Sequence, residues 1–353
     1  MLYVATDRRV AVVDPTAPVV EETFVPTTGD AGDSSDVGDA GDGVRVECVA
    51  SSRARPERAF AGTAGAGVFR TTDGGGSWSR VDLDAAVAGA GVDASHVTAV
   101  AVAPWDADVV FVGTEPSRVY RSVDGGETFA HLPGLMALPS SGEWAFPPRP
   151  HTHHVRWLEP DPGREGRVLV AVEAGALVVL DVDEGTASFV ERPPGSRRDT
   201  HAMATHPDAP GRVYAAAGDG YAESARHGDA WEHPQEGLGH RYCWSVAVDP
   251  ANPAVRLVSA ASGARTAHTP GRAESYVYRK RGDDPWERAM DGLPDPEGTT
   301  RPVLAAGDDA GECYAASNRG LFRTTDAGES WTRVDVDVPF DEGGGTARGL
   351  VAV

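Results

Sequence analysis

A chain of 353 residues usually divides into two or more domains, although repeat folds hold this much sequence in one closed unit. Acidic residues outnumber basic ones by 53 to 32, and the resulting net charge of −21 argues against nucleic acid as a partner. Lys280 is the only lysine, and an acidic, lysine-poor composition is typical of a salt-loving cytoplasm, so we expect higher thermal stability in molar salt.

The chain begins with strand-like sequence, and short Val- and Ala-rich runs separated by Gly, Pro and Asp continue along its length. This pattern predicts an all-β fold with many short strands. Residues 2–6 form the start of a strand rather than a signal peptide, and no apolar span is long enough for a membrane. We therefore expect a cytoplasmic protein with no membrane partner. Cys48, Cys243 and Cys313 lack metal-type spacing and are interpreted as core residues.

Three segments share one pattern, Ser/Thr-x-Asp-x-Gly-x-Ser/Thr followed by an aromatic residue. They lie within residues 68–78, 119–129 and 321–331. In such a turn the Asp side chain accepts hydrogen bonds from backbone amides, and the Gly permits unusual backbone angles. We interpret Asp73, Asp124 and Asp326 as structural turn residues rather than catalysts or metal ligands.

These three segments match the Asp-box pattern, and on them the chain resembles the BNR-repeat β-propellers. That broad group is related to WD40- and YVTN-like repeat proteins and includes sialidases, glucan hydrolases, sortilin-type receptors and photosystem assembly factors. The resemblance implies a β-propeller fold but says little about activity. Together with the acidic composition, it leads us to expect a haloarchaeal member of this sialidase-like superfamily.

Weaker copies of the pattern occupy residues 178–189, 221–231 and 278–286. A second shared pattern, an inner strand followed by a Pro/Asp turn and another strand, begins near residues 44, 96, 153, 201, 242 and 301. A further repeat is split between residues 347–353 and 1–25. We predict one domain over residues 1–353, a single seven-bladed β-propeller closed by pairing of the C-terminal strand with the N-terminal strands.

Antiparallel pairing within a blade places the Asp turns on one face and the blade entries on the opposite face, here called the top face. Longer segments at residues 29–43, 82–95, 133–150 and 262–274 fall in top-face loops, where recognition is usually found. Residues 29–43 are acidic and Gly-rich, and we expect them to form a mobile loop without a binding role.

Large residues form one column when the inner strands are aligned on their closing Pro. The column contains Glu47, Thr98, Arg156, His201 and Trp244, with Arg301 and Arg348 placed approximately. Equivalent positions of the inner strands would form a ring of side chains near the axis. Because guanidinium groups bind carboxylates and aromatic faces stack on sugars, these side chains predict a small anionic or sugar-like ligand. The predicted ligand-binding residues are His153, His154, Arg156, His201, Asp219, Tyr221, His240, Arg241, Tyr242, Trp244, Arg265, Glu274, Tyr276 and Arg301.

Two alternatives remain open at this point. His151 and His153 share one face of an extended strand, and His201 or His206 would supply a third metal-binding nitrogen, but the signal is weak and we predict no metal and no cofactor. A glycoside hydrolase would need two carboxylates across a cleft, for which Glu47, Glu173, Asp219 and Glu274 are candidates without a motif. Sialidases have six blades and a Phe/Tyr-Arg-Ile-Pro signature that is absent here. We therefore expect a monomeric, non-catalytic propeller that binds a ligand or a protein, with glycoside hydrolysis as the alternative.

Overall fold

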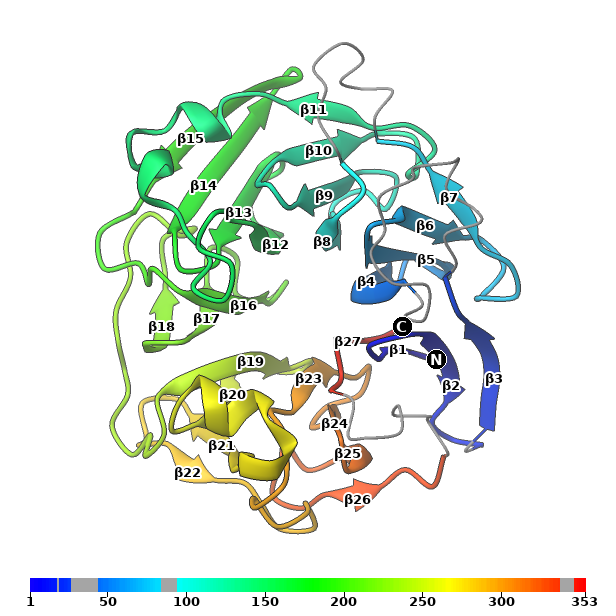
Figure 1. The fold of residues 1–353 in the computed structure, drawn as a ribbon. Coiled ribbons are helices and arrows are strands. Elements are labelled where there is room, and N and C mark those ends of the chain that lie inside the picture. Colours follow the sequence, from blue (N-terminus) through cyan, green and yellow to red (C-terminus); the bar gives the residue numbers. More distant parts are fainter. Residues whose placement is uncertain (18, 27–43, 84–93, 337–345) are drawn as a thin grey trace.

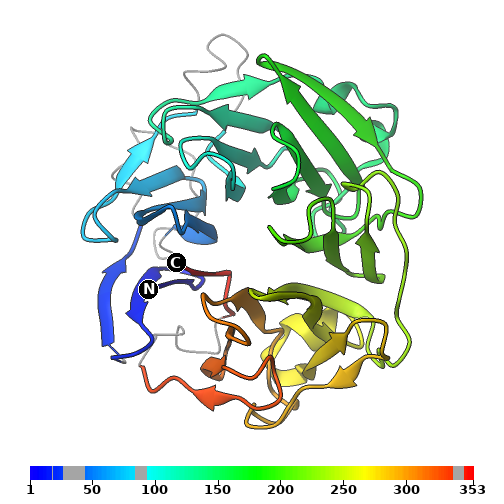
Figure 2. The same cartoon turned by 180° about the vertical axis from the view of Figure 1, so that it is seen from behind.

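The computed structural model describes residues 1–17, 19–26, 44–83, 94–336 and 346–353. These residues form seven antiparallel sheets around one axis, with almost no helix (Figure 1). The predicted seven-bladed β-propeller is confirmed. Seen from behind, the same ring of blades surrounds the same central opening (Figure 2). No helix among the described residues is long and apolar enough to cross a membrane.

Each blade presents one strand to the axis. The inner strands of blades 1 to 6 are β4 (Arg45–Ser52), β8 (Val97–Val102), β12 (Val155–Pro160), β16 (Thr200–Thr205), β19 (Tyr242–Asp249) and β23 (Val303–Ala306), and β27 (Gly349–Ala352) completes the ring in blade 7.

The remaining strands of each blade follow the inner strand outwards. Blade 1 adds β5 (Arg55–Ala64), β6 (Gly67–Thr71) and β7 (Ser79–Val81), and blade 2 adds β9 (Val110–Thr114), β10 (Val119–Ser122) and β11 (Ala130–Leu132). Blade 3 adds β13 (Arg167–Val172), β14 (Ala176–Asp183) and β15 (Thr186–Glu191), and blade 4 adds β17 (Val213–Ala217) and β18 (Gly220–Ser224). Blade 5 adds β20 (Asn252–Ala261), β21 (Ser275–Arg281) and β22 (Glu287–Arg288), and blade 6 adds β24 (Cys313–Ser317), β25 (Gly320–Thr324) and β26 (Thr332–Arg333).

Blade 7 is built from both ends of the chain. β27 pairs with β1 (Leu2–Ala5) from Ala352 opposite Leu2 to Gly349 opposite Ala5, and β2 (Val10–Asp14) and β3 (Val19–Phe24) continue the sheet outwards. The amino group of Met1 donates a hydrogen bond of 2.8 Å to the carbonyl oxygen of Val353, so the two termini lie side by side (Figure 1). The predicted closure of the ring by this strand is confirmed.

The hydrophobic core lies between neighbouring blades rather than inside any one of them. Phe111 and Val119 of blade 2 pack with Val155 and Val170 of blade 3, and all four side chains are fully buried. β-branched and aromatic residues suit such surfaces because they fill the space between two pleated sheets. Gly113 marks one close approach, since a Cβ there would lie 2.5 Å from the Val155 side chain.

The three Asp turns have the structural role that the sequence predicts. Asp73 accepts hydrogen bonds from the Thr71 hydroxyl at 2.7 Å and from the Ser77 amide at 2.9 Å and its hydroxyl at 2.6 Å. Asp124 and Asp326 accept the equivalent bonds in blades 2 and 6. Each carboxylate therefore closes its turn in the ionised form.

These turns should make the fold sensitive to acid. The hydrogen bonds from Ser77 lower the pKa of Asp73 to about 2. At Asp326 slight burial alone would raise the pKa, but the hydrogen bonds from Ser330 outweigh it and lower the pKa to about 2. Because these values lie below the pKa of about 3.9 in an unfolded chain, the stabilisation is complete above that pH and is lost as the pH falls from about 4 towards about 2. We expect the urea midpoint of the wild type to fall as the pH is lowered over this window. The midpoint of the Asp73→Asn/Asp326→Asn double variant should fall less. An equal decline in both proteins would contradict this assignment.

Candidate functional site at the axial opening

Five inner strands carry a β-bulge at the same position. The pairing register shifts at residues 47, 98, 156, 201 and 244, in β4, β8, β12, β16 and β19 respectively. These are the residues of the column that the sequence analysis picked out. A bulge inserts one unpaired residue and turns its side chain away from the regular alternation of the strand. The repeated bulge therefore explains why polar side chains occur in an otherwise apolar inner strand.

Two of these side chains, and that of Arg301 in the same column, bond to the next blade in the same way. The Thr98 hydroxyl donates to the carbonyl oxygen of Val155 at 2.6 Å, and Nδ1 of His201 lies 2.7 Å from that of Cys243. Arg301, just before β23, donates through Nη1 to the carbonyl oxygen of Ala347 at 3.0 Å. In each case the acceptor directly precedes the column residue of the next blade. Since a carbonyl only accepts, Nδ1 of His201 carries a proton.

Trp244 lies at the centre of a cationic cluster. The guanidinium carbon of Arg301 lies 3.8 Å from the centroid of the Trp244 ring, and that of Arg156 lies 4.6 Å from it. The ring of His201 packs against the same indole, with centroids 4.6 Å apart. Such contacts stabilise positive charge through the negative face of the aromatic ring. The indole thus holds two guanidinium groups from different blades at one place.

Arg301 forms no ion pair with an acid in the described part of the chain. Among the described residues no carboxylate lies within ion-pair distance of its guanidinium, which is 2% exposed. Burial, together with Arg348 and Arg156, lowers the pKa of Arg301 well below its usual value. Its Nε donates a hydrogen bond to Nδ1 of His268 at 3.0 Å, and burial followed by the Arg301 charge lowers the pKa of His268 to about 2. His268 is therefore neutral, and its Nε2 donates to the Tyr242 hydroxyl at 3.0 Å.

Acids and histidines alternate along the side of the axial opening that blades 1, 2 and 3 form. Glu47 lies 3.5 Å from Nε2 of His96, whose Nδ1 lies 3.7 Å from Glu115. Glu115 is 3.8 Å from Nδ1 of His154, and Nε2 of His154 bonds to Glu173 at 2.9 Å. This side of the opening contributes three carboxylates.

Two of these acids are held firmly ionised. Burial alone would raise the pKa of Glu173, but the hydrogen bond with His154 and the charge of Arg156 outweigh it, and the pKa is about 2. Glu47 likewise has a pKa of about 2, because contacts with His96, Arg348 and Arg45 outweigh burial. Neither carboxyl group can donate a proton at neutral pH.

Two of the top-face insertions reach this opening. Residues 133–150 contain η3 (Leu135–Ala137) and η4 (Pro139–Glu143), and beyond them Phe146 packs edge-on against His154 while Arg149 pairs with Glu115. Residues 262–274 contain α1 (Ala264–His268), which ends at His268, and η5 (Pro270–Arg272). The acidic stretch 29–43 and most of the insertion 82–95 lie outside the described residues.

The structure separates the predicted site residues into two groups. Those that meet at the opening are His154, Arg156, His201, Tyr242, Trp244 and Arg301. His153 lies beside them, with Nδ1 2.8 Å from the Ser117 hydroxyl and its ring edge-on to Trp144. Most of the others make their contacts elsewhere.

The placement of several predicted residues at the opening was wrong. Tyr221 is fully buried between blades 4 and 5 against Trp286, because its aromatic ring is a core side chain of β18. His240 stacks on Tyr276 of β21, with centroids 4.2 Å apart, and Tyr276 donates to Glu274 at 2.6 Å. His240, Glu274 and Tyr276 therefore form a separate cluster in blade 5, at the start of β21.

Asp219 also has its partner away from the cluster, whereas the binding roles of Arg241 and Arg265 stay predictions. Asp219 pairs with Arg197 at 3.4 Å at the surface of blade 4. Arg241 and Arg265 are exposed. The alternative histidine metal set does not form either, since His206 is bonded to the Pro250 carbonyl oxygen at 3.0 Å and His151 is exposed.

Glu115 is the main residue of the opening that the sequence reasoning missed. It directly follows β9, just as Glu173 directly follows β13. Alignment of the ends of the second strands would have revealed this pair. Both residues lie outside the inner strands that carry the column.

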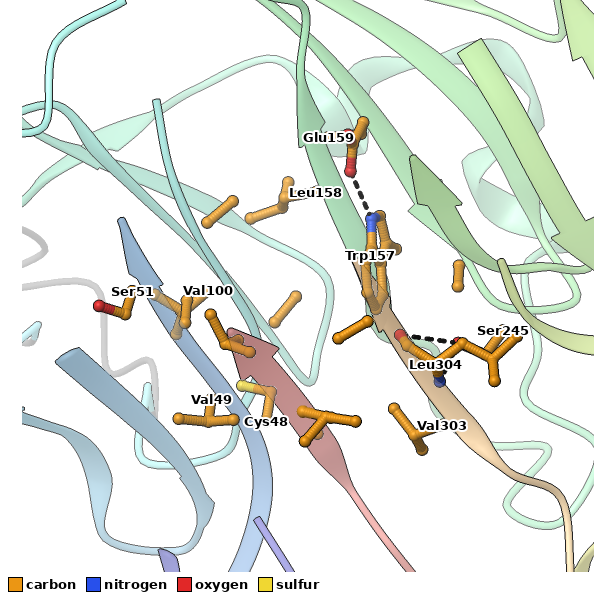
Figure 3. Close-up of a pocket in the computed structure, with 18 of the residues that line it drawn as sticks. Cys48, Val49, Ser51, Val100, Trp157, Leu158, Glu159, Ser245, Val303 and Leu304 are labelled. Atoms are coloured by element: carbon orange, nitrogen blue, oxygen red, sulfur yellow. Dashed lines mark hydrogen bonds between the residues drawn. The ribbon is translucent and has the colours of Figure 1, made fainter. Parts of the chain in front are cut away.

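A central cavity of about 350 Å³ extends from the opening along the axis. Inner strands of all seven blades line it, with Arg156, Trp244 and Arg348 at the top end. Below them the wall is mostly Val, Ala and Leu side chains, among which Glu159 accepts a hydrogen bond from Trp157 at 2.9 Å (Figure 3). The cavity therefore combines a charged mouth with an apolar channel.

Comparison with known proteins gives a match in fold but none in sequence family. No family model and no curated protein matches the chain. The solved structure of a GH74 enzyme from Niastella koreensis is similar, with a TM-score of 0.63 and 15% identity over 94% of this chain and 54% of that chain. A GH74 xyloglucanase from Xanthomonas campestris gives a TM-score of 0.60 and 18% identity over 95% and 56% of the two chains.

Another similar structure is YCF48 bound to D1 peptide, with a TM-score of 0.57 and 15% identity over 86% of this chain and 91% of that chain. The chain shares its propeller fold with GH74 enzymes and YCF48. It spans only 36% of an ancestral GH74 enzyme and about half of the two others. At these identities the similarity concerns the fold alone, and membership of the BNR-repeat family stays a prediction.

Proposed function

We propose that this propeller is a non-catalytic binding protein whose axial opening takes a carboxylate-bearing ligand. The observation that carries the proposal is the buried guanidinium of Arg301, which has no carboxylate partner among the described residues and packs on the Trp244 ring, as Arg156 does. A buried charge without a counter-ion is costly, and an anionic ligand would remove that cost.

Further support comes from Arg156. Its Nε is buried without a hydrogen-bond partner and lies 3.6 Å from Glu173, and the residue lines the mouth of the central cavity. Guanidinium groups bind carboxylates with good geometry, and the Val, Ala and Leu side chains of the cavity wall would contact the apolar part of the ligand. The carboxylate belongs to a small acid, an acidic sugar or an acidic side chain of a protein.

The test is titration calorimetry with citrate and glucuronate, and with glucose as the uncharged comparison. We expect one of the acids to bind and glucose not to bind. Arg156→Ala should weaken binding of that acid by about 1.5–3 kcal/mol, the size of a charge-assisted hydrogen bond, or about 10- to 150-fold, with little change in melting temperature. Asp124→Ala, which alters a structural turn on the opposite face, should lower the melting temperature and leave the affinity unchanged. The proposal fails if neither acid binds, or if the two variants have the same effect.

Glycoside hydrolysis, the activity named for the GH74 enzymes, is the second candidate. It requires one protonated and one ionised carboxyl group facing the sugar. Burial raises the pKa of Glu159 to about 7, which suits this carboxyl group to the protonated role. Glu159, however, is held by Trp157 at 2.9 Å and Thr205 at 2.8 Å near the far end of β12 from Arg156. Release of reducing sugar from xyloglucan that is lost in Glu159→Gln would favour this candidate over binding alone.

A further inference from the structure

Three potential metal ligands meet beside the axial opening. They are Glu173, which follows β13, Asp199, which precedes β16, and His201 in β16. One ligand atom from each lies within 4.8 Å of the other two. The sequence analysis predicted no metal site and did not combine these residues.

The imidazole of His201 is fully buried and its orientation is fixed. Nδ1 carries a proton because it donates to the Cys243 carbonyl oxygen, as the Thr98 hydroxyl does to Val155 in blade 2. In the neutral ring Nε2 is therefore a lone-pair acceptor. Nε2 makes no hydrogen bond, and it faces Oδ2 of Asp199 at 3.6 Å and Oε1 of Glu173 at 4.0 Å. Three acceptors facing each other require a positive charge between them.

The second oxygen atom of each carboxylate accepts a hydrogen bond that holds the side chain in place. Oδ1 of Asp199 accepts the backbone amide of Ala174 at 2.9 Å, which leaves Oδ2 free to face His201. Oε2 of Glu173 is bonded to His154 at 2.9 Å, which leaves Oε1 free in the same way. Metal-binding side chains typically have such partners, which fix the direction of the remaining lone pair.

The separations suit an ion better than a protonated histidine. Separations of 3.6 and 4.0 Å are too long for hydrogen bonds, so a proton on Nε2 of His201 would have no acceptor at bonding distance. Ligand atoms around one ion at bond lengths of about 2.0–2.2 Å lie roughly 3–3.6 Å apart. A small inward movement of the two carboxylates would complete the coordination.

We propose that Glu173, Asp199 and His201 bind a divalent transition-metal ion. One imidazole and two carboxylates suit Zn²⁺ or Mn²⁺ rather than Mg²⁺ or Ca²⁺, which prefer oxygen ligands alone. The two carboxylates balance the charge of the ion. Asp199 is half-buried and provides access from solvent, so a fourth position is open to water or to a ligand at the opening. The inference does not depend on the proposed carboxylate ligand.

The experiment is calorimetric titration of tag-free, EDTA-treated protein with Zn²⁺, with Mg²⁺ as the comparison, together with visible absorption after addition of Co²⁺. We expect one Zn²⁺ per chain, no heat from Mg²⁺, and Co²⁺ bands that Zn²⁺ abolishes. Asp199→Asn keeps an oxygen for the Ala174 amide but loses the charge, and should weaken Zn²⁺ binding at least 10-fold.

The matched control is Asp219→Asn, which removes the same charge close by in a residue that pairs with Arg197 instead. It should bind Zn²⁺ like the wild type. Gly218→Ala gives a second test that keeps all three ligands, because a Cβ at residue 218 would lie 2.1 Å from Oδ2 of Asp199 and displace it. The proposal is overturned if no stoichiometric Zn²⁺ binding occurs, or if Asp199→Asn and Asp219→Asn bind Zn²⁺ equally. Citrate and glucuronate play no part in these titrations, so failure here leaves the carboxylate proposal standing.

Discussion

Deletion of residues 349–353 is expected to abolish cooperative folding. The deletion removes β27, which pairs with β1 along its whole length and is the inner strand of blade 7. It also removes Leu350 from the cluster that Leu2, Val4 and Tyr314 form between blades 6 and 7. With β27 absent, β1 presents an unpaired edge to the axis and the ring is no longer closed, so both unfolding and aggregation are favoured.

Thermal unfolding followed by circular dichroism, together with size-exclusion chromatography, measures this effect. Deletion of Val353 alone is the control, because it leaves β27 intact and removes the terminal bonds to Met1 and one partly buried side chain. The shorter deletion should reduce the melting temperature slightly. A deletion of residues 349–353 that stays monomeric with an unchanged melting temperature would show that strand closure does not hold the propeller together.

Replacement of Trp244 by Ala should have the second largest effect. The side chain is 7% exposed, and both Arg156 and Arg301 pack on its ring. Loss of a buried Trp typically costs about 3–5 kcal/mol of unfolding free energy. The substitution also leaves the buried charge of Arg301 without its aromatic contact, which adds to the cost.

Urea unfolding monitored by circular dichroism measures the loss for Trp244→Ala. Trp244→Phe serves as the control, since it keeps an aromatic face for the two guanidinium groups and should recover much of the stability. The double variant Trp244→Ala/Arg301→Met should be more stable than Trp244→Ala alone, because it removes the buried charge as well. Equal stability of the Ala and Phe variants would contradict a role for the aromatic face.

The amino-acid sequence by itself determined the fold and its closure. The Asp turns and the alternation of strands and turns are local signals, each of which spans about ten residues. Their repetition along the chain predicts the number of blades. The same repetition placed Arg156, His201 and Trp244 in one column. The column could be predicted because equivalent positions of repeated blades face the same axis.

Only the tertiary structure decided which of the polar residues meet. Tyr221 and Trp244 are both aromatic residues that follow predicted top-face loops, yet Tyr221 packs between two blades while a bulge turns Trp244 to the axial opening. Glu173, Asp199 and His201 come together because blades 3 and 4 pack side by side, which brings the end of β13 against the entry of β16. Such contacts depend on the angle and register between blades, and these are set by side-chain packing across the whole ring rather than by any local sequence pattern.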